Sequence, residues 1–126
     1  MRVIKFRAWD KQLNIMVYAG NEVIFYLNYL PQRIIMQFTG LLDKNGKEIY
    51  EGDILQTLNY RNKSEANYVF HQVKWSDKYN AYVVINLLCK TDELTESGNT
   101  FLYVLFNKMD SKIIGNIYAT PEKLKS

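Results

Sequence analysis

The chain has 126 residues, of which 48% are hydrophobic and 23% charged, and its formal net charge is +3. A chain of this length and apolar content can bury a core as a single domain, so the composition excludes an intrinsically disordered protein. Positive and negative residues alternate along the sequence without a basic tail. The charge pattern therefore gives no electrostatic footprint for nucleic acid.

The sequence shows no sign of secretion or membrane insertion. Cys89 is the only cysteine, which excludes an internal disulfide and fits a reducing compartment. Lys5 and Arg7 interrupt the start of the chain before an apolar segment develops. No apolar run approaches the roughly 18 residues that a membrane-spanning helix requires. We therefore expect a cytoplasmic protein that does not contact a membrane.

Residues with a preference for β-strands are abundant, among them ten Tyr and six Phe, which predicts a mainly β protein. Residues 4–8 alternate between apolar side chains and the cations Lys5 and Arg7. This alternation is typical of a strand with one buried face and one wet face, the wet face carrying both cations. A turn is expected over 10–14, and residues 15–18 complete a first hairpin.

Residues 22–30 allow two interpretations. Some of their apolar side chains are spaced as on one face of a helix, but the residues between them are also apolar or aromatic. A buried strand explains the same letters, and we favour the strand. Pro31 ends the element, because proline cannot donate to a ladder and restricts the residue before it.

The next segment has the clearest strand and turn signals. Residues 34–39 alternate regularly, and Gly40 then interrupts the pattern. Asn45-Gly46 predicts a type I′ hairpin turn, because both residues tolerate the positive φ that this turn requires. The expected elements that follow are a strand at 47–50, a tight corner at Glu51-Gly52-Asp53 and a strand at 54–58.

The second half of the chain predicts four more strands. Residues 68–75 and 81–88 are joined by a short polar turn and should pair as an antiparallel hairpin. Residues 101–106 are apolar at both odd and even positions, which suits a strand buried on both faces or one packed at an interface. Residues 113–118 form the last strand, in which Gly115 marks a bulge or a close backbone approach.

The chain lacks the groups from which common catalytic sites are built. His71 is the only histidine and lies in mid-strand on an apolar face, so we expect it in the core and not in a nucleophilic triad. One Cys and one His cannot make a zinc site, and no phosphate-binding or dinucleotide-binding glycine pattern occurs. We expect no catalytic residue, no metal and no cofactor, and hence a protein that is not an enzyme.

Glu48, Glu51 and Asp53 are close enough in sequence to hold Mg²⁺ or to act as an acid–base pair. A structural role explains them better. Asp53 can bond the backbone of its own turn, while Glu48 and Glu51 face solvent. A metal-dependent hydrolase is retained as a third class of function.

Three blocks of sequence carry a family signature. They are FRAWD at 6–10, MQFTGL at 36–41 continued by DKNGKEIYEGDI at 43–54, and IGNIY at 114–118 ahead of Pro121. In order and spacing they resemble the YopX family of phage and prophage proteins, whose members have no established activity. The resemblance implies a mainly β domain that contains an SH3-like barrel or roll. Within the blocks, Phe38 and Ile54 are expected to fill the core.

The expected organisation is a single YopX-like domain over residues 1–126 with at most short helical segments. An N-terminal β-hairpin extension occupies about 1–33, and an SH3-like β-barrel core occupies about 34–119. Thr120-Pro121 then starts a helical turn at 120–126, because a cap residue is followed by proline at the first helical position.

The leading functional hypothesis is a phage- or prophage-encoded, non-enzymatic binding or assembly module that acts through protein contacts. Segments 23–30 and 101–106 have too few polar positions for one-face burial in a small barrel, so we expect a homo-oligomer or a complex with another phage or host protein. The expected interface residues are Trp9, Phe101 and Tyr103, because exposed aromatics often mark interfaces.

The alternative is a small β-barrel that binds nucleic acid through the loop region from Tyr60 to Phe70. Aromatic side chains there can stack on bases beside cations that contact phosphate. The expected contacts are Tyr60, Arg61, Lys63 and Tyr68. A solvated loop with tyrosines at its strand ends explains the same residues.

Overall fold

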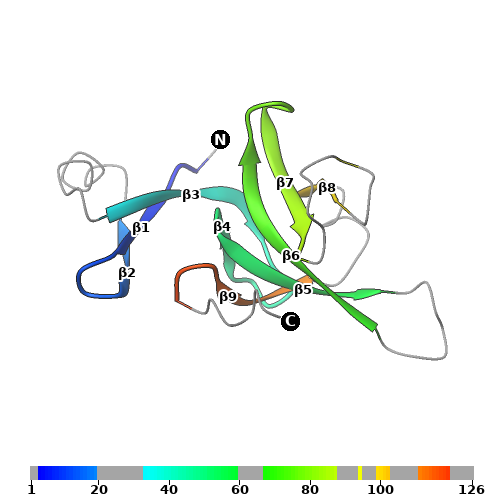
Figure 1. Ribbon diagram of the computed structural model, residues 1–126, viewed down its shortest axis with the longest axis horizontal. Helices are drawn as coiled ribbons and strands as arrows, with labels where there is room; N and C mark the ends of the chain where they lie inside the picture. Colours follow the sequence, from blue (N-terminus) through cyan, green and yellow to red (C-terminus); the bar gives the residue numbers. More distant parts are fainter. Residues whose placement is uncertain are drawn as a thin grey trace.

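The computed structural model describes residues 3–19, 33–59, 67–87, 94, 99–102 and 111–119. These residues are almost all in β-strands and turns, which confirms the predicted mainly β class (Figure 1). In this part of the chain no helix has the length and apolar character needed to cross a membrane. The predictions for residues 22–30, for residues 60–66 of the Tyr60–Phe70 loop region and for the helical turn at 120–126 lie outside the described residues.

The first sheet has four strands in the order β2-β1-β3-β4. In chain order they are β1 (Phe6–Asp10), β2 (Ile15–Ala19), β3 (Arg33–Leu42) and β4 (Glu48–Tyr50). The predicted first hairpin is confirmed, with Asp10 opposite Ile15 in the β1–β2 register. The Asp10 carboxylate closes its turn by accepting the backbone N–H groups of Gln12 and Leu13 at 2.9 and 3.0 Å.

The turn between β3 and β4 differs from the predicted type I′ turn. Gly46 has a φ of +81°, but Asn45 is not among the residues with positive φ. The Asp43 carboxylate accepts the backbone N–H groups of Asn45 and Lys47, both at 2.9 Å, and Gly46 N–H bonds Asp43 C=O at 3.0 Å. These bonds favour a turn with ordinary φ values at its centre, followed by glycine in the left-handed region. Asp43 therefore decides the turn type.

The second sheet has five strands in the order β8-β7-β6-β5-β9. They are β5 (Asp53–Asn59), β6 (Asn67–Ser76), β7 (Ala81–Asn86), β8 (Thr100–Phe101) and β9 (Ser111–Asn116). The predicted β6–β7 hairpin is confirmed. The predicted bulge is confirmed as well, because Ile54 pairs with Gly115 while Leu55 pairs with Ile113, which leaves one extra residue in β9.

The predicted strand at 101–106 is confirmed at Phe101 and wrong at Leu102. β8 ends at Phe101, and Leu102 already has a helical conformation. Leu102 is 2% exposed and belongs to the hydrophobic core, and an apolar residue can be buried in a helical conformation as well as in a strand, so its apolar neighbours in the sequence did not distinguish the two. Residues 103–106 lie outside the described part of the chain.

Both sheets curl around one hydrophobic core and together form a half-barrel (Figure 1). The core combines Ile49 of the first sheet with Leu55, Val73 and Val84 of the second sheet and with Leu102, which follows β8. Each is at most 2% exposed, and full burial of such a side chain stabilises the fold by about 1.5–3 kcal/mol. Phe38, Ile54 and His71 are buried too, as predicted.

Candidate functional site

A buried arginine lies where the two sheets meet. Arg7 of β1 is 3% exposed, and its Nη2 donates to Asp53 Oδ1 and to the backbone oxygen of Glu51, both at 2.9 Å. Its guanidinium lies over the Tyr50 ring, 4.8 Å from the centroid. The prediction that Arg7 lies on a wet face is therefore wrong. The β4–β5 corner covers that face, and Asp53 supplies the countercharge.

Asp53 connects this arginine to the corner at residues 51–53. Its Oδ2 accepts the Tyr50 backbone N–H at 2.8 Å, which confirms the prediction that Asp53 bonds its own turn. Gly52 forms the corner with a φ of +87°. Burial raises the pKa of Asp53, while the charge of Arg7 and the Tyr50 N–H oppose that rise.

Glu51 is not solvated as predicted. It is half-buried, and its Oε1 accepts the backbone N–H of Gln37 at 2.8 Å. Burial raises the pKa of Glu51, and this hydrogen bond and the nearby Arg7 lower it in part. The prediction failed because β3, which supplies the N–H group, approaches the corner from a distant part of the chain.

The three acids grouped in the sequence are held separately in space. Glu48 pairs with Lys5, Glu51 bonds β3 and Asp53 bonds Arg7. Among the described residues, no three His, Cys, Asp or Glu side chains are grouped so that they could hold a metal ion. The arrangement therefore gives no support to the hydrolase hypothesis.

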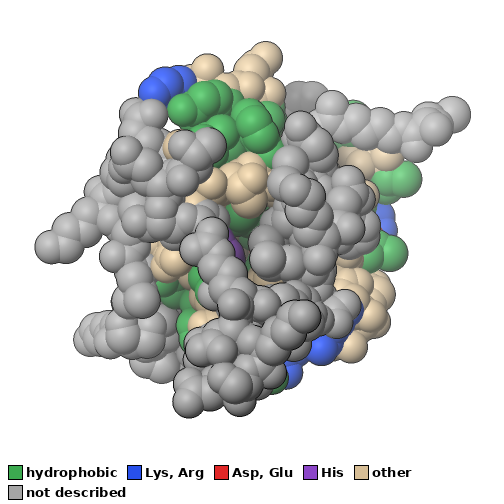
Figure 2. Space-filling model, turned by 90° about the vertical axis from the view of Figure 1, so that its right-hand side faces the viewer, with side chains coloured by type: hydrophobic (Ala, Val, Ile, Leu, Met, Phe, Trp, Pro, Cys, Tyr) green, Lys and Arg blue, Asp and Glu red, His purple; other side chains and the backbone are tan. Residues whose placement is uncertain are grey.

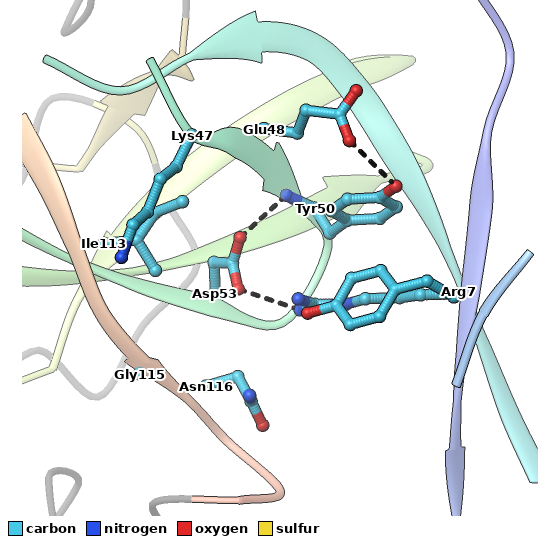
Figure 3. Close-up of a pocket in the computed structure, with 9 residues that line it drawn as sticks. Arg7, Lys47, Glu48, Tyr50, Asp53, Ile113, Gly115 and Asn116 are labelled. Atoms are coloured by element: carbon cyan, nitrogen blue, oxygen red, sulfur yellow. Dashed lines mark hydrogen bonds and ion pairs between the residues drawn. The ribbon is translucent and has the colours of Figure 1, made fainter. Parts of the chain in front are cut away.

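A cavity of about 330 Å³ opens beside the Arg7–Asp53 pair (Figure 3). Its lining comes from five strands and the β3–β4 turn: Arg7, Tyr18, Lys47, Glu48, Tyr50, Asp53, Ile113, Gly115 and Asn116. Tyr18 and Tyr50 pack edge-to-face with centroids 5.7 Å apart. Burial and the charge of Glu48 raise the pKa of Tyr50 from 10.0 to about 12, so its hydroxyl keeps its proton to a higher pH than an ordinary tyrosine does. The cavity thus offers aromatic surface and paired charges.

The expected interface residues lie at two separate places. Trp9 is half-buried and stacks on Tyr118 with a centroid distance of 6.1 Å. Phe101 is also half-buried and packs edge-to-face on Tyr79 at 5.7 Å, near the β6–β7 turn. Figure 2, which views the molecule from the right-hand side of Figure 1, shows hydrophobic side chains gathered near the top of that face. Tyr103 lies outside the described residues, and the interface role of all three stays a prediction.

Of the expected nucleic-acid contacts, the structure describes Tyr68, which is 53% exposed on β6. Tyr60, Arg61 and Lys63 lie outside the described residues. The structure therefore does not bring these four side chains together as a described site.

Sequence reasoning missed Arg7, Tyr18 and Tyr50 as parts of a site. One signal for Arg7 was present, because a cation in an otherwise apolar strand and an acid after a glycine corner can form a buried pair. Tyr18 and Tyr50 had no such signal, since their approach depends on how the hairpin packs against β4.

The chain is similar to a protein-family model and to a solved structure. The family model described as YopX protein matches residues 19–125. The crystal structure of protein EF1440 from Enterococcus faecalis is similar over 98% of this chain and 99% of that chain, with a TM-score of 0.61 and 23% sequence identity. At this identity the similarity concerns the fold alone. The comparison with curated proteins gave no match.

Proposed function

We propose that this chain, which belongs to the YopX family, is a non-enzymatic binding or assembly module that acts through protein contacts. In this proposal a phage or prophage encodes the protein, which works in the cytoplasm of the host cell and associates with a second copy of itself. The observation that carries the proposal is the outer edge of β2.

The β2 edge is open in the described part of the chain, because β2 is the first strand of its sheet. Antiparallel strands direct the N–H and C=O groups of successive residues to alternate sides. Phe38 N–H donates to Lys5 C=O, so the backbone groups of Arg7 face β3 and those of Ala8 face β2. Ala8 lies opposite Val17, and the groups of the next residue, Tyr18, therefore point away from β1.

The side chains of β2 do not protect this edge. Natural edge strands are commonly blocked by charged residues, especially Lys, or by Pro, and β2 has neither. Ile15 is 48% exposed and Tyr18 is 63% exposed, and Leu13 in the preceding turn is 62% exposed. Two such edges can pair antiparallel about a two-fold axis without bringing like charges together. A second copy of this chain therefore fits the edge.

The test is the oligomeric state of the full chain, measured by sedimentation velocity at micromolar concentration. Tyr18→Lys places a charge on the edge and should weaken association at least about tenfold, or 1.4 kcal/mol. Leu42→Lys is the matched control, because Leu42 is an apolar strand residue, 44% exposed, on a different part of the first sheet. A strictly monomeric wild-type protein, or equal weakening by both substitutions, would contradict the proposal.

A further inference from the structure

A second surface feature lies between β3 and β6. A groove of about 250 Å³ separates the first half of β3 from the second half of β6, and the corner residues Glu51 and Gly52 border it. Figure 1 shows where these two strands approach each other. The other lining residues are mostly apolar: Ile34, Ile35, Met36, Gln72, Val73, Lys74, Trp75, Ile117 and Tyr118. The groove is distinct from the β2 edge.

The β3 side of the groove is an open strand edge. Because Phe38 N–H bonds Lys5, the backbone groups of Ile35 and Gln37 point away from β1. Those of Gln37 are satisfied by Glu51, whose backbone N–H donates to Gln37 C=O at 3.0 Å and whose carboxylate accepts Gln37 N–H. Within the described residues no such partner lies beside Ile35. Its N–H and C=O groups therefore face the groove.

The β6 side is open in the same way. Leu87 N–H donates to Phe70 C=O, so the backbone N–H and C=O groups of Phe70 and of every second residue after it in β6 point toward β7. Trp75 lies between two of these residues, and its backbone groups therefore point to the opposite side. β5 begins at Asp53, one residue before Ile54, which lies opposite Gln72. In the described part of the chain, β5 therefore ends its pairing before it reaches Trp75. Two strand edges thus direct backbone hydrogen-bonding groups toward one cavity.

We propose that this groove binds an extended peptide segment of a partner protein in which apolar and basic side chains alternate. The open edges call for a partner with extended backbone, since a β-strand supplies N–H and C=O groups at the matching spacing. The apolar walls formed by Ile117 and the rings of Trp75 and Tyr118 suit apolar side chains of that segment.

The charge of the bound segment follows from Glu51. This carboxylate lines the groove and is half-buried, with one oxygen bonded to Gln37 N–H. Burial leaves the ionised Glu51 carboxylate without a full countercharge. A Lys or Arg of the peptide supplies that charge and is therefore stabilised beside it. Lys74 also lines the groove and repels basic side chains, but it is exposed, so solvent screens its charge more than that of the half-buried Glu51.

The experiment uses the full chain and an acetylated Val-Lys-Val-Lys-Val-Lys peptide, followed by two-dimensional amide NMR. Binding should shift the amide signals of Ile35, Gly52 and Trp75. The same peptide with N-methyl groups on alternate residues cannot pair as a strand and should bind at least about tenfold more weakly. Equal binding of the methylated peptide, or shifts confined to other residues, would overturn the proposal.

Two matched variants test the charge. Glu51→Gln keeps an oxygen for Gln37 N–H but removes the charge, and it should weaken binding of the Lys peptide about fivefold. Glu48→Gln removes a charge outside the groove and should leave binding unchanged. Equal effects of the two variants, or displacement of the peptide by single-stranded DNA or RNA, would refute the assignment. Tyr18→Lys, which tests self-association, should not alter peptide binding, so the two proposals can fail separately.

Discussion

Removing the buried arginine should cost much of the protein's stability. Arg7→Met keeps an apolar stem but deprives Asp53 of its countercharge, and the side chain of Asp53 is only 2% exposed. One hydrogen bond to that carboxylate remains, from the Tyr50 N–H. Breaking a buried ion pair by removing one partner costs about 3–5 kcal/mol. A domain of this size loses roughly 4 °C of Tm per kcal/mol, so the expected fall is about 12–20 °C.

The assay is urea unfolding followed by circular dichroism, with a double-mutant cycle. Asp53→Asn should also be destabilising, and the double variant should be about 2–3 kcal/mol more stable than the sum of the two losses predicts. Arg33→Met is the matched control, because its pair with Asp10 at 3.4 Å is more accessible, and its loss should be much smaller. A loss below about 1 kcal/mol for Arg7→Met, or simple additivity, would refute the reasoning.

Three further predictions concern individual residues. Gly52→Ala should destabilise the fold by about 1 kcal/mol more than Gly40→Ala in urea unfolding, since both have positive φ but only at Gly52 would the new Cβ meet a side chain, at 3.1 Å. Equal losses would contradict this. The raised pKa of Tyr50, about 12 against an ordinary 10.0, means that its contribution to stability is complete below pH 10 and is lost as the pH rises toward 12; ultraviolet titration should show a late-ionising tyrosine that Tyr50→Phe removes. Asp43→Ala removes the acceptor for three backbone N–H groups, one of them from Ile113, and should cost about 2–4 kcal/mol; a neutral result in thermal unfolding would count against its role.

Local signals predicted much of the fold. The alternation over residues 68–75 and the short polar turn after it were enough to place the β6–β7 hairpin. Gly115 indicated the bulge in β9 because an interior glycine weakens a regular ladder. These predictions succeeded because the determinants lie within a few residues of the element that they specify.

The candidate site depends on contacts that are distant in sequence. Alternation placed Arg7 on the opposite face from Ala8, but it could not show that the β4–β5 corner covers that face, 46 residues further along the chain. The groove beside Ile35 was invisible for a similar reason. It exists because β5 begins too late to pair with Trp75, and this follows from the register of two sheets.

The way β3 is shared has a mechanical consequence. Its first five residues pair with β1, and beyond them Phe38 and Leu42 pair with β4, so one continuous backbone belongs to both ladders. A force applied to the N-terminal hairpin is therefore transmitted to the β3–β4 ladder through the continuous backbone of β3. Separating the hairpin from the rest of the molecule would require breaking one of these ladders, which makes early detachment under force costly.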